Sequence, residues 1–287
     1  MRRLVPILRV ALAALACTAL VRGAPAGSAP ATYPWLADAA PRETLAARIP
    51  PPPGLKRVPL PAGSFGTWLR DLPMKPAGTP VHLYNGAAKP RQDVHFAVLD
   101  VDVGTRDLQQ CADAVMRLRA EWLLAAGRAN AIAFNDTGSG KPIAFSRWAA
   151  GERPRISGNA LTWSARARPD AGYASFRRYM DTVFAWAGTY SLERELKPVP
   201  VADIAPGDVF IKGGFPGHAV LVADVARDAA TGESRFLLLQ SYMPAQDIHV
   251  LKNPAAPDGA AWYPAAFGDK LVTPEWIFAR DSLRRWR

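Results

Sequence analysis

The sequence predicts an α+β fold in which helices precede an antiparallel sheet along the chain. Hydrophobic residues recur with helical spacing at 107–126 and 173–187, and Gly127 and Gly188 follow these two segments as stop signals. After residue 200 the pattern changes to short apolar runs separated by turn residues, which is typical of an antiparallel meander. The predicted strands are 94–103, 208–212, 218–226, 236–242 and 248–251.

The N-terminal residues have the pattern of a secretory signal peptide. Arg2, Arg3 and Arg9 precede the apolar run 10–21, and Ala24-Pro25-Ala26 follows it. The run is shorter than the roughly 20 residues that a membrane-spanning helix needs. We therefore expect a signal peptide at 1–26, export to the periplasm or cell envelope, and no transmembrane span. Cys17 leaves open a lipid anchor.

The remaining chain divides into a linker and one domain. Residues 27–54 are rich in Ala, Pro and Gly and are expected to form an extended tether. Residues 55–287 contain no second linker of this kind and are expected to form one α+β domain.

Composition excludes several classes of function. The chain of 287 residues has a net charge of +10, but the leader contributes part of it and the other charges are interspersed with acids. This distribution argues against a nucleic-acid partner. Two cysteines and four histidines are too few for a disulfide scaffold or a zinc cage, so no metal and no cofactor are expected.

Cys111 is the first candidate for chemistry. It lies in the first turn of the helix predicted at 107–126, where Asp107 and Gln110 have capping-box spacing. The positive end of a helix lowers the pKa of a thiol and favours the nucleophilic thiolate. A buried structural cysteine is the alternative.

His218 and Gln240 complete a candidate constellation. His218 begins a predicted strand directly after the Gly-rich connection 213–217, and Gln240 follows four apolar residues on the next strand. A cysteine on a helix end facing a histidine on a sheet edge is a nucleophile-and-base arrangement, and a polar third group orients the imidazole. Asp247 and His249 are alternatives to Gln240 in that role.

Two family resemblances follow from these residues. The segments 206–211 (PGDVFI) and 217–222 (GHAVLV) resemble the His-bearing hairpin of the NlpC-type and CHAP-type papain-like cysteine peptidases and amidases of bacterial cell walls. The order of Cys111, His218 and Gln240 is similar to theirs, although Ala112-Asp113 replaces the Ser-Gly that follows the NlpC-type cysteine. The resemblance implies a Cys-bearing helix packed on an antiparallel sheet. The long interval between Cys111 and His218 implies an inserted subdomain at about 127–200.

The second resemblance covers nearly all of residues 55–280. The segments 109–113 (QQCAD), 208–220 and 240–246 (QSYMPAQ) resemble a bacterial family of unknown function, the 4846 family.

The expected function is therefore cysteine-dependent hydrolysis of amide bonds, with peptidoglycan stem peptides as the substrate class. Cys111 is the expected nucleophile, His218 the general base and acid, and Gln240 the orienting group. Backbone N–H groups at the start of the Cys111 helix are the expected oxyanion donors. The alternative is a non-catalytic cell-envelope binding module that retains a papain-like shell.

Overall fold

The structure is a computed structural model that describes Met1 and residues 33–36, 38 and 40–287. The predicted signal peptide beyond Met1, Cys17 and the first residues of the predicted tether lie outside the described residues. The helices of the described part include none long and apolar enough to cross a membrane.

The largest element is a nine-stranded sheet in which all neighbouring strands are antiparallel. This confirms the predicted mixed α+β class. Seven strands follow one another in space, while β1 (Lys56–Arg57) pairs with β9 and β12 (Tyr263–Pro264) pairs with β10. The seven are, in spatial order, β2 (His95–Val98), β11 (His249–Leu251), β10 (Ser234–Gln240), β9 (His218–Arg227), β8 (Val209–Lys212), β15 (Leu283–Arg285) and β7 (Lys197–Pro198).

Strand β9 is the centre of this sheet, and nine of its ten residues are buried. Its side chains alternate between two cores, as a strand covered on both faces requires. Ala219 and Leu221 belong to the larger core that contains the helices. Val220 and Val222 belong to a second core on the other face, together with Phe210. Small Ala219 lets a helix approach the start of the strand closely.

The helix that lies on this face of β9 is α3 (Cys111–Ala125). Helix α5 (Tyr173–Trp186) packs against α3 in turn. The shorter helices are α1 (Leu45–Arg48), α2 (Phe65–Arg70), α4 (Phe145–Ala149) and α6 (Thr189–Glu195), and 3₁₀ turns occupy Ala129–Ala131, Val201–Asp203 and Arg280–Ser282.

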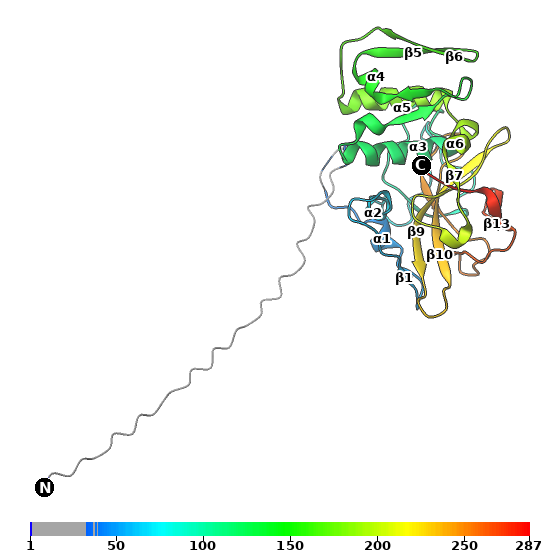
Figure 1. The fold of residues 1–287 in the computed structure, drawn as a ribbon. Helices are drawn as coiled ribbons and strands as arrows, with labels where there is room; N and C mark the ends of the chain where they lie inside the picture. The colour runs from blue at the N-terminus through cyan, green and yellow to red at the C-terminus, as the bar shows by residue number, and fades with distance from the viewer. Residues whose placement is uncertain (2–32, 37, 39) are drawn as a thin grey trace. The chain divides into compact units, whose positions relative to one another are not determined.

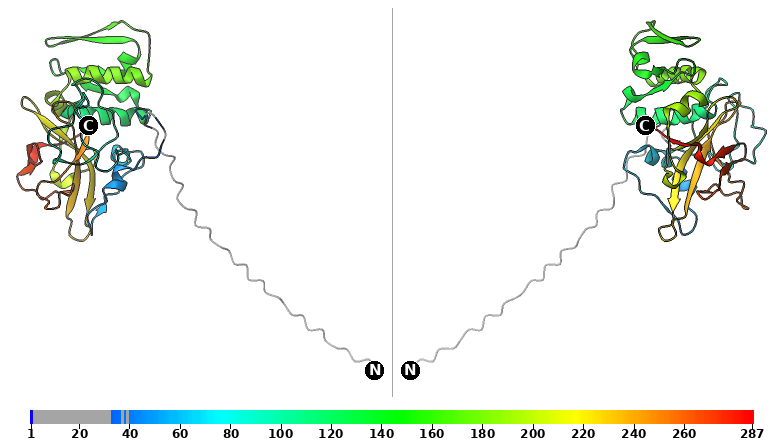
Figure 2. Two further views of the ribbon diagram at one scale, coloured as in Figure 1. Left: turned by 180° about the vertical axis from the view of Figure 1, so that it is seen from behind. Right: turned by 45° about the vertical axis from the view of Figure 1, so that its right-hand side comes forward.

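Residues 129–186, between α3 and α6, form a separate layer. It contains the hairpins β3–β4 (Ala133–Asn135 and Pro142–Ala144) and β5–β6 (Glu152–Ser157 and Ala160–Ala165) with α4 and α5. Figures 1 and 2 show α3 between this layer and the main sheet. A last hairpin, β13–β14 (Lys270–Val272 and Ile277–Ala279), contributes Phe278 to the second core.

The largest differences from the predicted boundaries are in three segments, and the strand predicted at 236–242 is Ser234–Gln240. The helix predicted from residue 107 begins at Cys111, and the strand predicted at 94–103 ends at Val98. The end of the predicted tether, 27–54, is part of the fold, because Leu45 and Ile49 are buried in the larger core. The sequence did not predict this packing, because isolated buried residues in a Pro-rich segment give no periodic hydrophobic pattern.

Candidate active site

Cys111 is the first residue of α3, and the structure explains why the helix begins there. Gln110 has an extended backbone at the N-cap position, and its N–H donates to Asp113 Oδ2 at 3.0 Å. The capping carboxylate is therefore Asp113. Asp107 instead accepts the side-chain amide of Gln110 at 3.1 Å, so the capping pair predicted from Asp107 and Gln110 is wrong. At the first helical position the backbone N–H groups have no intrahelical partner.

The thiol of Cys111 is buried, with 8% of the residue exposed. Burial raises its pKa, and the nearby carboxylate of Asp113 raises it further, to about 11. The backbone N–H groups of Ala112 and Ala219 act in the opposite direction but are outweighed. This differs from the lowered pKa expected for a helix N-terminus. In the resting protein Cys111 is a neutral thiol.

Buried polar contacts hold the loop before Cys111 in place. Arg117 is fully buried, and its guanidinium donates to Gln109 Oε1 at 2.9 Å and to Glu121 at 2.6 Å. The hydroxyl of Ser241 donates to the carbonyl oxygen of Gln109 at 3.0 Å. Ser241 directly follows Gln240, so the Cys111 loop and the end of β10 are joined by this hydrogen bond.

His218 and Gln240 are brought together on neighbouring strands of the sheet. His218 Nε2 and Gln240 Oε1 are 2.8 Å apart, and Gln240 Nε2 donates to Glu275 Oε2 at 2.7 Å. A carboxylate only accepts, so Glu275 turns the amide with its oxygen toward His218. The neutral imidazole must then carry its proton on Nε2. Nδ1 is left unprotonated and can accept a proton.

The two alternatives to Gln240 lie elsewhere. Asp247 accepts from Lys75 Nζ at 2.8 Å and from the backbone N–H of His82 at 2.9 Å. His249 is fully buried, and its Nδ1 lies 2.9 Å from the carbonyl oxygen of Asp247. Of the three polar candidates, Gln240 is the one that contacts His218.

Aromatic rings enclose the His218–Gln240 pair. The His218 ring centroid lies 4.9 Å from that of Tyr242, 5.3 Å from Trp276 and 5.8 Å from Phe278. Burial among these rings lowers the pKa of His218 to about 4, although Gln240 raises it in part. The imidazole is therefore neutral near pH 7, as a general base must be.

The Cys111 thiol lies near the backbone at the start of β9, where His218 is the first residue of the strand. The backbone N–H of Ala219, the residue after His218, partly lowers the pKa of the Cys111 thiol, and the ring of His218 lies against that of Tyr242. Among the described residues no hydrogen bond joins the Cys111 thiol to the imidazole.

Sequence reasoning missed two residues of this site, Glu275 and Lys89. Lys89 is 5% exposed, and its Nζ donates to Glu275 Oε2 and to Gln246 Oε1, each at 2.8 Å. A continuous series of hydrogen bonds therefore runs from His218 through Gln240 and Glu275 to Lys89. Both missed residues lie in irregular segments, where no spacing pattern marks them.

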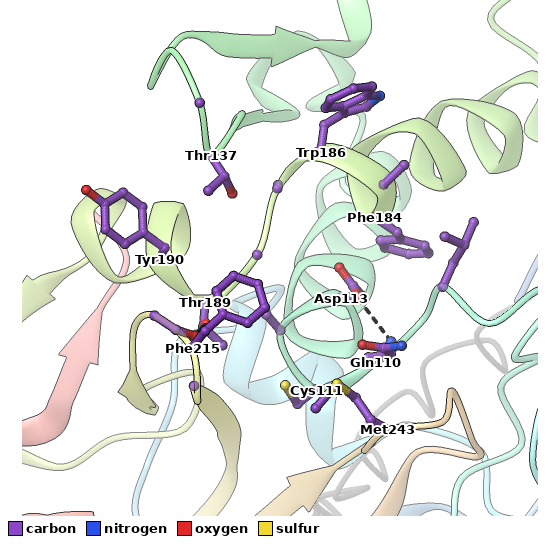
Figure 3. Close-up of a pocket in the computed structure, with 18 of the residues that line it drawn as sticks. Gln110, Cys111, Asp113, Thr137, Phe184, Trp186, Thr189, Tyr190, Phe215 and Met243 are labelled. Carbon is purple, nitrogen blue, oxygen red and sulfur yellow. Dashed lines mark hydrogen bonds between the residues drawn. The ribbon is translucent and has the colours of Figure 1, made fainter. Parts of the chain in front are cut away.

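A cavity of about 480 Å³ opens beside Cys111. Figure 3 shows it between the start of α3, the loop carrying Phe215, and the segment around Trp186 and Thr189. Trp186 is 44% exposed and lines this cavity, whereas Trp148 is buried in the core and Trp163 packs against the core. Nowhere in the described ranges do three His, Cys, Asp or Glu side chains gather as metal ligands would.

Comparison with known proteins identifies a family. A family model described as a domain of unknown function (4846) matches residues 45–285. No curated protein and no solved structure matches the chain. The match begins at the first residue of α1 and ends in β15, so it covers the fold described above. The chain therefore belongs to the family of unknown function 4846.

Proposed function

We propose that the protein is an exported cysteine-dependent hydrolase of amide bonds, with peptidoglycan stem peptides as its substrate class. The observation that carries the proposal is the hydrogen bond of 2.8 Å between His218 Nε2 and Gln240 Oε1, because it leaves Nδ1 unprotonated and able to accept a proton. The order of Cys111, His218 and Gln240 resembles that of papain-like cysteine peptidases. Export to the periplasm or cell envelope is proposed from the leader pattern of residues 1–26.

The reaction begins as Cys111 transfers its proton to His218 Nδ1 and its sulfur attacks the amide carbonyl carbon. The oxyanion that forms accepts hydrogen bonds from backbone N–H groups at the start of α3. The C–N bond then breaks, and His218 returns the proton to the departing amine. Water attacks the resulting thioester with His218 again taking the proton, which releases the carboxylic acid and restores the thiol.

In the resting protein Cys111 and His218 are both neutral, and this determines how the first step proceeds. With a thiol of pKa about 11 and an imidazole of pKa about 4, proton transfer is unfavourable until the sulfur bonds to carbon. Transfer and attack are therefore coupled in the proposed mechanism. Gln240 stabilises the imidazolium by accepting from Nε2, and the Glu275 carboxylate stabilises it through Gln240.

The direct experiment incubates the protein with purified peptidoglycan fragments and reads the products by mass spectrometry. The proposal expects fragments split at an amide bond with gain of one water, by the wild type and not by Cys111→Ala or His218→Ala. Identical products from wild type and Cys111→Ala would exclude a thiol mechanism. Intact fragments after incubation with the wild type would exclude this substrate class.

A second function, a non-catalytic envelope-binding module, is favoured by one observation. Cys111 is protonated at rest and makes no hydrogen bond to His218 among the described residues. This alternative predicts that Cys111→Ala sediments with peptidoglycan as fully as the wild type does, and that neither protein cleaves it.

A further inference from the structure

Asp113, in the first turn of α3, has one carboxylate oxygen that accepts no hydrogen bond from the described residues. Asp113 Oδ2 accepts the N–H of Gln110, but Oδ1 is buried and has no hydrogen-bond partner among the described residues. The residue is 6% exposed and lines the cavity beside Cys111. In Figure 3 the free oxygen points away from Gln110 toward the space between Thr137 and Trp186. An unpartnered buried carboxylate oxygen costs free energy unless a ligand supplies a donor.

The charge of the cavity is opposite to that of the whole chain. The sequence has 35 Lys and Arg against 25 Asp and Glu, yet the cavity lining contains Asp107 and Asp113 and no Lys, Arg or His. A carboxylate or phosphate group would meet no counter-charge there. A positively charged group would meet one.

The cavity wall adds aromatic surface that suits a cation. Phe215 is 99% exposed and Trp186 is 44% exposed, and both belong to the lining. The faces of such rings attract ammonium and guanidinium groups. Burial raises the pKa of Asp113 well above its usual range, and a cation beside it would restore the charged form.

We propose that this cavity binds a positively charged group of the substrate, an ammonium or guanidinium, with Asp113 Oδ1 as its anchor. The inference rests on the proposed hydrolase function and narrows its substrate class to amides that carry such a group near the scissile carbonyl. Asp113 acts as a specificity-determining residue.

Charged thiol reagents test this without a known substrate, because Cys111 is the one cysteine of the described chain. Cationic 2-(trimethylammonium)ethyl, neutral methyl and anionic 2-sulfonatoethyl methanethiosulfonates each form a disulfide with Cys111 and release methanesulfinate. Each rate is divided by that of the same reagent with glutathione. We expect the cationic reagent to be favoured over the anionic one by about tenfold. Equal normalised rates would overturn the proposal.

The matched variants are Asp113→Asn and Asp258→Asn. Asp113→Asn keeps an oxygen that can accept the Gln110 N–H. In this variant we expect the glutathione-normalised rates of the cationic and anionic reagents to be about equal. Asp258 is exposed and outside the cavity lining, and its change should leave the preference intact. A preference that survives in folded Asp113→Asn would overturn the assignment of Asp113.

A competition experiment on the wild type covers the case in which Asp113→Asn does not fold. Pentane-1,5-diamine should slow modification by the neutral reagent, whereas pentane-1,5-diol should not. If the diamine and the diol slow the modification of Cys111 equally, the cavity binds neutral hydrogen-bond donors as well as cations, and the proposed preference for a positive charge is overturned. Because labelling needs no amide cleavage, failure of the hydrolase proposal and failure of this inference are distinguishable.

Discussion

The buried ion pair of Glu275 with Lys89 allows a quantitative prediction. The two side chains are 10% and 5% exposed and lie 2.8 Å apart. Glu275→Gln removes the negative charge but keeps an oxygen that can accept from Gln240. The Lys89 ammonium is then buried without a counter-charge, and the general cost of breaking such a pair is about 3 kcal/mol of unfolding free energy.

The sign of the pH dependence follows from Lys89. Burial already lowers its pKa, and Glu275 raises it in part. Without Glu275 that pKa falls further, so the native state binds fewer protons than the unfolded chain as pH rises toward about 10. Stability of the variant therefore rises with pH, and the penalty of Glu275→Gln shrinks between pH 7 and pH 10.

Urea unfolding of wild type and variants at both pH values is the assay. Lys89→Met combined with Glu275→Gln should cost less than the sum of the two single changes, since no buried charge is left alone. Asp93→Asn breaks the exposed pair with Arg91 and serves as the control, with a change within about 0.5 kcal/mol. A penalty for Glu275→Gln below about 1 kcal/mol and equal at both pH values would refute the reasoning.

Three further predictions concern the fold. Arg117→Met leaves Glu121 buried and should lower the unfolding free energy by about 3–5 kcal/mol, whereas adding Glu121→Gln should recover part of it in the same urea assay. Leu45→Ala, in the segment whose composition predicted a tether, should lower the unfolding free energy by about 2–5 kcal/mol. Lys56→Ala, at an exposed position, should leave it almost unchanged. Equal effects of the two changes would contradict the burial of α1. Burial raises the pKa of Glu195 to about 7, so between pH 4.5 and 7 the native state binds one more proton than the unfolded chain does. The unfolding free energy should therefore fall by about 1–3 kcal/mol as the pH rises through that range. Glu195→Gln should abolish this slope, and a slope that persists would rule out Glu195 as its source.

The sequence predicted those parts of the site that lie in regular elements. Cys111 could be placed on a helix, and His218 and Gln240 on adjacent strands, because hydrophobic periodicity and turn residues mark such elements. The hydrogen bond between His218 and Gln240 agrees with the predicted orienting contact, although its role in catalysis stays a proposal.

The remainder depends on tertiary contacts that leave no local pattern. Glu275 and Lys89 come from irregular segments that are distant in the sequence and form an ion pair. The raised pKa of Cys111 is likewise a tertiary effect, since burial against β9 and the charge of Asp113 outweigh the helix N-terminus. Sequence position alone could assign the helix end but not the burial of the thiol.

The most direct test of the central claim is acylation of Cys111 by an activated ester such as p-nitrophenyl acetate, followed by intact-mass spectrometry at pH 7.5. If His218 is the base, the wild type acquires one acetyl group on Cys111, and His218→Ala acquires it at least about 100-fold more slowly. Gln240→Leu should fall between them, because the imidazole loses the group that fixes its tautomer. Equal acylation rates for wild type and His218→Ala would contradict the account.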